Sequence, residues 1–160
     1  MNTINSWWPL SSIVGGMGVP GYSKESVYNY IALAFWNCGD ELYDMVKVWD
    51  KPSQFIGAEF FGTSNDADAR EQLKRKYNEG GVKIMISAFG GTAHPTSEKK
   101  DPTQCAKELA AFVLSHSLDG VDIDYEDNAA MEAGTGATWV ITFTRVLRER
   151  LPNHIITHAP

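Results

Sequence analysis

Acidic and apolar residues alternate from Val121 to Glu126, within the stretch Leu-Asp-Gly-Val-Asp-Ile-Asp-Tyr-Glu-Asp-Asn at residues 118–128. A period of two is the side-chain period of a β-strand. The pattern therefore places Asp122, Asp124 and Glu126 on one face of a strand, with the apolar residues between them on the other. Neighbouring acids on that face are about 6.5–7 Å apart at their Cα atoms.

The apolar face of this strand is rich in β-forming residues, so we expect helices to cover it and the acidic face to point into an enclosed space. Carboxyl groups that share a low-dielectric site cannot all ionise cheaply, so at least one pKa should rise. A raised pKa lets a carboxylic acid stay protonated near neutral pH and act as a general acid. A solvated strand end and a calcium loop are the alternatives. An EF-hand loop starting at Asp122 would need Gly and Glu where the chain has Asp127 and Ala133.

The pattern elsewhere predicts further strands and helices in alternation. Nearly continuous apolar runs are typical of strands buried on both faces, and strands are predicted at residues 11–14, 27–36, 82–88 and 153–159, besides the acidic one. Capping residues and apolar stripes indicate helices at residues 41–50, 65–79, 101–116 and 138–151. Residues 55–61 fit either a strand or a loop, and residues 92–100 and 129–136 are predicted to be loops.

This order predicts an α/β fold in which helices cover a parallel sheet. A doubly wound sheet would use Gly15 to Gly18 as a phosphate-binding turn, but no helix pattern follows directly and no ribose-binding acid lies at the expected distance. A (β/α)₈ TIM barrel carries its catalytic residues at the C-terminal ends of its strands. Glu126 is the last residue of the alternation, so we predict the barrel.

Composition limits the classes of function. The 160 residues suit one domain, and 43% hydrophobic content allows a sizeable core. A net charge of −6 argues against nucleic acid or an anionic membrane as partner, and no run of 18 apolar residues is present. Residues 1–5 lack the features of a signal peptide, so the chain as given reads as cytoplasmic, or as a secreted form without its leader. Two cysteines, Cys38 and Cys105, do not make a disulfide framework.

Three motifs carry a resemblance to a known family. Residues 119–126 (DGVDIDYE) resemble the DGxDxDxE signature of glycoside hydrolase family 18, which contains chitinases and endo-β-N-acetylglucosaminidases. Residues 87–91 (SAFGG) resemble the family's SxGG motif after the third barrel strand, with one extra residue before the glycines. Ala34-Phe35 resembles the Ala-Phe at the end of its second strand. The order and spacing of the motifs agree with the family, and the chain is most similar to fungal-type members.

The resemblance implies a retaining, substrate-assisted hydrolysis of β-1,4-linked N-acetylglucosamine polymers. Glu126 would protonate the glycosidic oxygen, while the 2-acetamido carbonyl of the substrate attacks the anomeric carbon and forms an oxazolinium ion. Asp124 would orient the acetamide, and Asp122 would exchange a proton with Asp124. Asp119 has the opposite parity and is interpreted as structural.

The resemblance also implies a sugar-binding wall around the acids. Phe35 would line the floor of the sugar subsites, and Ser87, Gly90 and Gly91 would shape the barrel wall. The aromatic pair at residues 7–8 could stack on sugars or simply cover the core. No metal or other cofactor is implied, and the histidines show no ligand spacing.

The chain departs from the family in two respects. Many family chitinases have Tyr directly after the catalytic acid, where this chain has Asp127. A complete barrel needs about 250 residues, so we interpret residues 1–160 as the N-terminal portion of a single barrel with about five strands. The family's later tyrosine and tryptophan, which contact the sugar, have no counterpart here.

An incomplete barrel would expose two sheet edges. We therefore expect either self-association or a missing C-terminal half that completes the barrel. A catalytically inactive carbohydrate-binding protein on the same scaffold is the alternative to an enzyme. The sequence leaves open whether the substrate is chitin or the N-glycan core, and whether the action is endo or exo.

Overall fold

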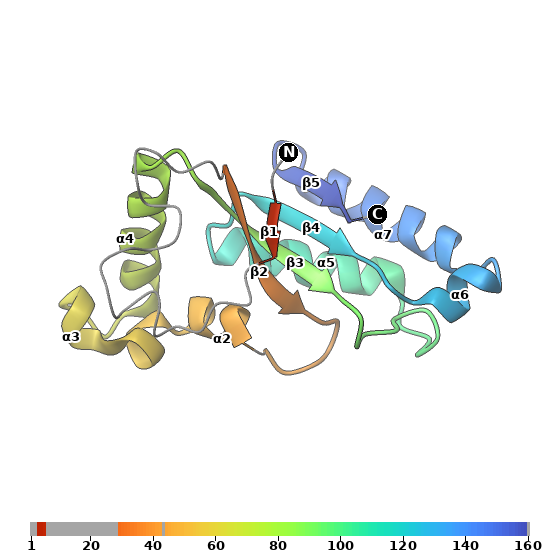
Figure 1. Ribbon diagram of the computed structural model, residues 1–160, viewed down its shortest axis with the longest axis horizontal. Coiled ribbons are helices and arrows are strands. Elements are labelled where there is room, and N and C mark those ends of the chain that lie inside the picture. Colours follow the sequence, from red (N-terminus) through yellow and green to blue (C-terminus); the bar gives the residue numbers. More distant parts are fainter. Residues whose placement is uncertain (1–2, 6–28, 43, 160) are drawn as a thin grey trace.

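The computed structural model describes residues 3–5, 29–42 and 44–159. Five parallel strands form one sheet in their sequence order (Figure 1). They are β1 (Thr3–Asn5), β2 (Tyr30–Trp36), β3 (Lys83–Phe89), β4 (Gly120–Asp124) and β5 (Ile155–His158). The predicted α/β fold with a parallel sheet is thus confirmed, whereas closure into an eight-stranded barrel stays a prediction.

The predicted helices form close to their expected positions. They are α2 (Asp44–Asp50), α4 (Asp66–Glu79), α5 (Pro102–Ser115) and α7 (Gly136–Arg150). The starts of α4 and α5 follow from the sequence. The Asn65 side chain accepts hydrogen bonds from the first turn of α4. Asp101 likewise accepts from Gln104 N, 2.8 Å away, and Pro102 is the first residue of α5.

Other elements differ from the prediction. Residues 55–61 are helical, in a π-helical turn (Ser53–Gly57) and a short helix α3 (Ala58–Phe61), because local bonds such as Thr63 N to Ala58 O satisfy the backbone. A short helix α6 (Asn128–Glu132) replaces the loop predicted at 129–136. The first strand lies at Thr3–Asn5, and the strand predicted at 11–14 falls outside the described residues, as do the aromatic pair at 7–8 and the glycines at 15–18.

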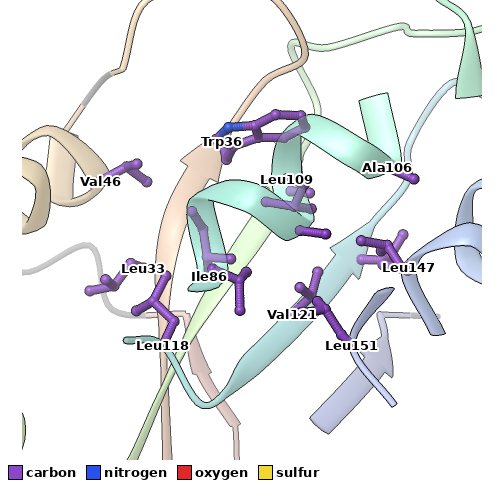
Figure 2. Packing of buried hydrophobic residues seen from close by; sticks show 14 of the residues in the cluster. Leu33, Trp36, Val46, Ile86, Ala106, Leu109, Leu118, Val121, Leu147 and Leu151 are labelled. Carbon is purple, nitrogen blue, oxygen red and sulfur yellow. The ribbon is translucent and has the colours of Figure 1, made fainter. Parts of the chain in front are cut away.

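The main core lies between the sheet and the helices α5 and α7 (Figure 2). Val121 and Ile123 of β4 are both almost completely buried there, together with Leu109 of α5 and Leu147 of α7. The apolar face of the acidic strand is therefore covered by helices, as predicted. In the described part of the chain, no helix has both the length and the apolar character needed to cross a membrane.

The cysteines correct the sequence analysis, because Cys38 and Cys105 form a disulfide across 67 residues of sequence. Cys38 follows β2, and Cys105 lies in the first turn of the helix after β3. Since β2 and β3 are neighbours in the sheet, the segments that follow them meet at the same end. Counting cysteines could not reveal a pairing that depends on strand order.

Candidate active site

The predicted acids lie at the C-terminal end of β4. Asp122 and Asp124 are the third and last residues of the strand and are 5% and 9% exposed. Glu126 follows two residues after the strand ends, and its side chain is exposed. The strand is shorter than the predicted alternation, because the chain bends into α6 after Glu126.

Hydrogen bonds from both neighbouring strands hold Asp122. Ser87 Oγ on β3 donates to one carboxylate oxygen over 3.1 Å, and Thr157 Oγ1 on β5 donates to the other over 2.6 Å. The sheet register pairs Asp122 with both residues. Sequence reasoning found Ser87 but missed Thr157, which the register of a parallel sheet could have indicated.

The expected pKa perturbation occurs at Asp124. Burial raises the pKa of this carboxyl above its ordinary value, and the nearby carboxyls of Glu126 and Asp122 raise it further. The cause is the one expected from the sequence, since desolvation and like charges both penalise a second or third negative charge. Asp124 can consequently keep or share a proton at a higher pH than an isolated aspartate.

Phe35 lies against the glycine motif. Between Leu33 and Trp36 the register of β2 against β3 shifts by one residue, so β2 has an additional residue there. A Cβ atom at Gly90 would lie only 2.9 Å from Cζ of Phe35, and Gly90 has a φ of +74°. Gly90 therefore suits this position for two reasons: its positive φ and the close approach of the aromatic ring.

The extra residue of the SAFGG motif is turned away from the acids. Phe89 has a φ of +82°, and its buried ring packs against Trp139 and Phe143 of α7, with centroids 5.5 and 5.2 Å apart. The following glycines still reach the acids, because a Cβ at Gly91 would lie 3.4 Å from Oε2 of Glu126. The insertion is thus absorbed on the helix side of the sheet.

The structure brings the predicted site residues into pairwise proximity: Ser87 with Asp122, Phe35 with Gly90, and Gly91 with Glu126. Asp119 lies elsewhere, as predicted from its parity. Its carboxylate accepts a hydrogen bond from Ile84 N over 2.9 Å and pairs with Lys74 over 3.2 Å. This arrangement joins the start of β4 to β3 and α4.

Asp127 was not recognised as a structural residue from the sequence. It is 1% exposed and accepts hydrogen bonds from Ser97 N, Ser97 Oγ and Ala130 N, at 2.7, 2.6 and 3.3 Å. Burial is the largest influence and raises its pKa, but these bonds and the nearby His94 outweigh it, so the pKa of Asp127 is lowered. An aspartate just before a helix is a capping signal that could have predicted α6.

The described residues contain no group of three or more His, Cys, Asp or Glu side chains that could hold a metal ion. The chemistry that the geometry offers is that of carboxyl groups. Two are nearly buried, one is exposed at the end of the strand, and an aromatic ring and two glycines lie beside them.

Of three comparisons with known proteins, the one with solved structures found matches. No protein-family model and no curated protein matches the chain. Among solved structures, the chain is similar to the crystal structure of a GH18 chitinase from Pseudoalteromonas aurantia, with 31% sequence identity and a TM-score of 0.61. The match covers 89% of this chain and 52% of the chitinase chain, so the chain spans about half the length of that structure. The fold of the described residues is therefore similar to that of a GH18 chitinase.

Proposed function

We propose that this chain carries the acidic site of a glycoside hydrolase that cleaves β-1,4-linked N-acetylglucosamine polymers, namely chitin or chitooligosaccharides. The observation that carries the proposal is the arrangement of Asp122, Asp124 and Glu126 at one end of a parallel sheet. The similarity to a GH18 chitinase supports the same substrate class.

The proposed mechanism is retaining and substrate-assisted. Glu126 is exposed at the end of the strand, where it can reach a glycosidic oxygen and protonate it. The substrate's acetamide carbonyl then attacks the anomeric carbon, the bond to the leaving sugar breaks, and an oxazolinium ion forms. Water opens this ion, and Glu126 takes up the proton of that water.

Asp124 supports the acetamide in this proposal. Its raised pKa allows it to hold a proton that can be exchanged with Asp122 as positive charge develops on the oxazolinium. Asp122 is fixed by Ser87 and Thr157, so it offers a rigid acceptor next to Asp124. Phe35, beside Gly90, is proposed to form the floor below the reacting sugar.

The proposed domain is the N-terminal portion of one barrel, of the fungal type that the sequence as a whole resembles. In the described residues, β1 pairs only with β2 and β5 only with β4. We propose that a further segment or a second copy of the chain supplies strands to these edges. An inactive carbohydrate-binding protein on the same scaffold is the second candidate.

The test compares three forms on a fluorogenic N-acetylchitooligosaccharide: wild type, Glu126→Gln and Glu132→Gln. Glu132 is an exposed glutamate at the end of α6, so its substitution makes the same chemical change outside the site. Removing a general acid should lower kcat about 10²- to 10⁴-fold in Glu126→Gln alone. Sugar binding without release of fluorophore in any form would support the inactive binding protein instead.

A further inference from the structure

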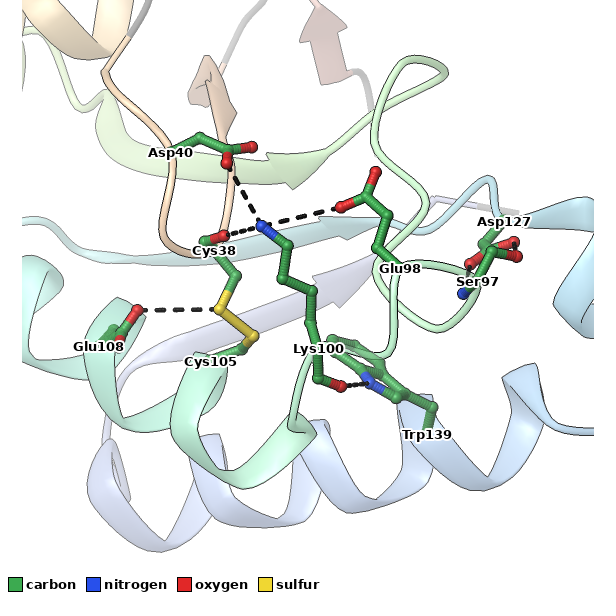
Figure 3. A network of polar contacts seen from close by, with 9 residues as sticks. All are labelled: Cys38, Asp40, Ser97, Glu98, Lys100, Cys105, Glu108, Asp127 and Trp139. Atoms are coloured by element: carbon green, nitrogen blue, oxygen red, sulfur yellow. Dashed lines mark hydrogen bonds and ion pairs between the residues drawn. A yellow bond between two sulfur atoms is a disulfide. The ribbon is translucent and has the colours of Figure 1, made fainter.

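The loop between β3 and α5, residues 92–101, is fixed to several elements around the acids. Thr96 Oγ1 and Tyr125 OH are 2.6 Å apart, and Trp139 Nε1 on α7 donates to Lys100 O over 2.8 Å. Lys100 Nζ in turn donates to Cys38 O over 2.6 Å, next to the disulfide (Figure 3). The loop therefore links the segments that follow β2 and β4.

The contact between this loop and Asp127 is made by two hydrogen bonds from one residue, Ser97. The Asp127 carboxylate receives both the backbone and the side-chain donor of Ser97, and it also caps α6 through Ala130 N. All of this occurs at a side chain that is 1% exposed. Hydrogen bonds to a charged group are about twice as strong as neutral ones, so this contact ties the loop firmly to the start of α6.

Glu126 lies between two residues that are bonded to the loop. Tyr125 before it contacts Thr96, and Asp127 after it contacts Ser97. The backbone around Glu126 is also bonded, since Gly90 N donates to Asp124 O and Asn128 N donates to Glu126 O, each over 2.8 Å. The exposed Glu126 side chain thus projects from a backbone that the loop holds on both sides.

We propose that Asp127, acting through Ser97, is a positioning residue that sets the direction of the Glu126 side chain for proton transfer. This inference rests on the proposed hydrolase function. Asp127 is buried and points to the loop, so it acts on Glu126 through the backbone. A displacement of about 1 Å at a reacting group can cost about 10²-fold in rate, so a loosened turn should lower kcat.

The experiment measures kcat and KM of the 160-residue chain for an N-acetylchitooligosaccharide in Asp127→Asn and Ser97→Ala. An amide has one acceptor oxygen, so Asp127→Asn cannot receive all of its donors, and we expect kcat to fall at least about tenfold with KM within about twofold. Ser97→Ala keeps the backbone donor and should cost less. The double variant should be no slower than Asp127→Asn alone, because both changes remove the same link.

The matched control is Asp101→Asn. Asp101 is the capping aspartate at the other end of the same loop and accepts from Gln104 N. Asn caps a helix about as well as Asp, so this variant makes the same acid-to-amide change at another capping residue of the loop without touching the turn at Glu126. Its kcat should stay at the wild-type value. A folded Asp127→Asn that keeps the wild-type kcat would overturn the inference.

Two further readouts separate this inference from the proposed function. Amide hydrogen exchange over residues 125–128 should quicken in Asp127→Asn and not in Asp101→Asn, and unchanged exchange would overturn the positioning role. Glu126→Gln is measured in parallel. If it retains full activity, the proposed function fails and the role of Asp127 in proton transfer fails with it. If it is inactive while Asp127→Asn is fully active, only the positioning role is overturned.

Discussion

At the residue scale, the acids of β4 are under different constraints. Asp122 is held by hydroxyl donors from both neighbouring strands, whereas burial and like charge raise the pKa of Asp124. The folded state therefore binds the Asp124 proton more tightly than the unfolded state does. This contribution favours folding at low pH, and it is lost as the pH rises from the ordinary aspartate value through the raised pKa.

The first prediction concerns Asp124→Asn. Because the amide cannot ionise, the variant avoids the penalty of the buried charge, and its melting temperature relative to wild type should increase as the pH rises through the raised pKa. The same variant should lose most activity on N-acetylglucosamine oligomers. Thermal unfolding of both forms between pH 4 and 8 measures the difference, and a difference that does not change with pH would contradict the assignment.

The second prediction concerns Asp119, whose parity placed it outside the acidic face of the strand. Its removal leaves Ile84 N and Lys74 without their carboxylate partner, so Asp119→Ala should lower the free energy of unfolding by about 1–3 kcal/mol. Denaturant titration tests this. Asp68→Asn, at an exposed site on α4, is the control and should change stability by less than about 0.5 kcal/mol. Equal effects of the two substitutions would contradict the structural role.

Strand periodicity predicted which acids share a face, since parity follows directly from the order of residues. It could not predict the partners of those acids. Thr157 contacts Asp122 because of the sheet register, and Ser97 contacts Asp127 because of the path of the loop. Strand periodicity around the acids determines neither the register nor the loop path. The left-handed turn at Phe89, which absorbs the extra residue of the glycine motif, is likewise decided by the space available beside α7.

At the element scale, helices with clear end signals were the most predictable. Asn65 and Asp101 cap α4 and α5 at the expected positions, because capping depends on residues within one turn. Residues 55–61 were less predictable, because their aromatic residues fit a strand as well as a helix. Phe61 is buried and Phe60 is half exposed, so packing against α2 and its neighbours, which periodicity does not reveal, decided the outcome.

The third prediction concerns the disulfide that joins the segment after β2 to α5. A cross-link across 67 residues removes unfolded-state entropy worth about 4 kcal/mol in the chain-entropy model, with typical measured effects of about 2–4 kcal/mol. Reduction, or the Cys38→Ser/Cys105→Ser double variant, should lower the free energy of unfolding by that amount. Thiol titration of the unreduced, denatured protein should find no free thiol, and two free thiols would contradict the pairing.

At the scale of the whole molecule, β1 and β5 are the outer strands of the sheet in the described residues. Parallel sheets are normally covered and their edges protected, and the comparison chitinase is about twice as long as the region matched here. The sequence predicted β2 to β5 and their parallel direction, whereas β1 was not predicted. It could not predict what pairs with the free edges of β1 and β5, because in the described residues each of these strands pairs with one neighbour only.

The fourth prediction follows from these edges. If another chain or segment completes the sheet, the isolated 160-residue chain should self-associate, and its mass by light scattering should exceed 17.7 kDa as concentration increases. Addition of a polypeptide that supplies the remaining strands should convert it to a defined complex. A folded, stable monomer at all concentrations would count against this assembly.

The central claim is that Asp124 and Glu126 act on a sugar whose own acetamide is the nucleophile. The most direct test compares the wild-type rates on two fluorogenic oligosaccharides that differ only at C2, one with the acetamido group and one with a hydroxyl. The hydroxyl substrate cannot form the oxazolinium ion, so its hydrolysis should be slower by at least about 10³-fold. Comparable rates on the two substrates would contradict the mechanism proposed for this site.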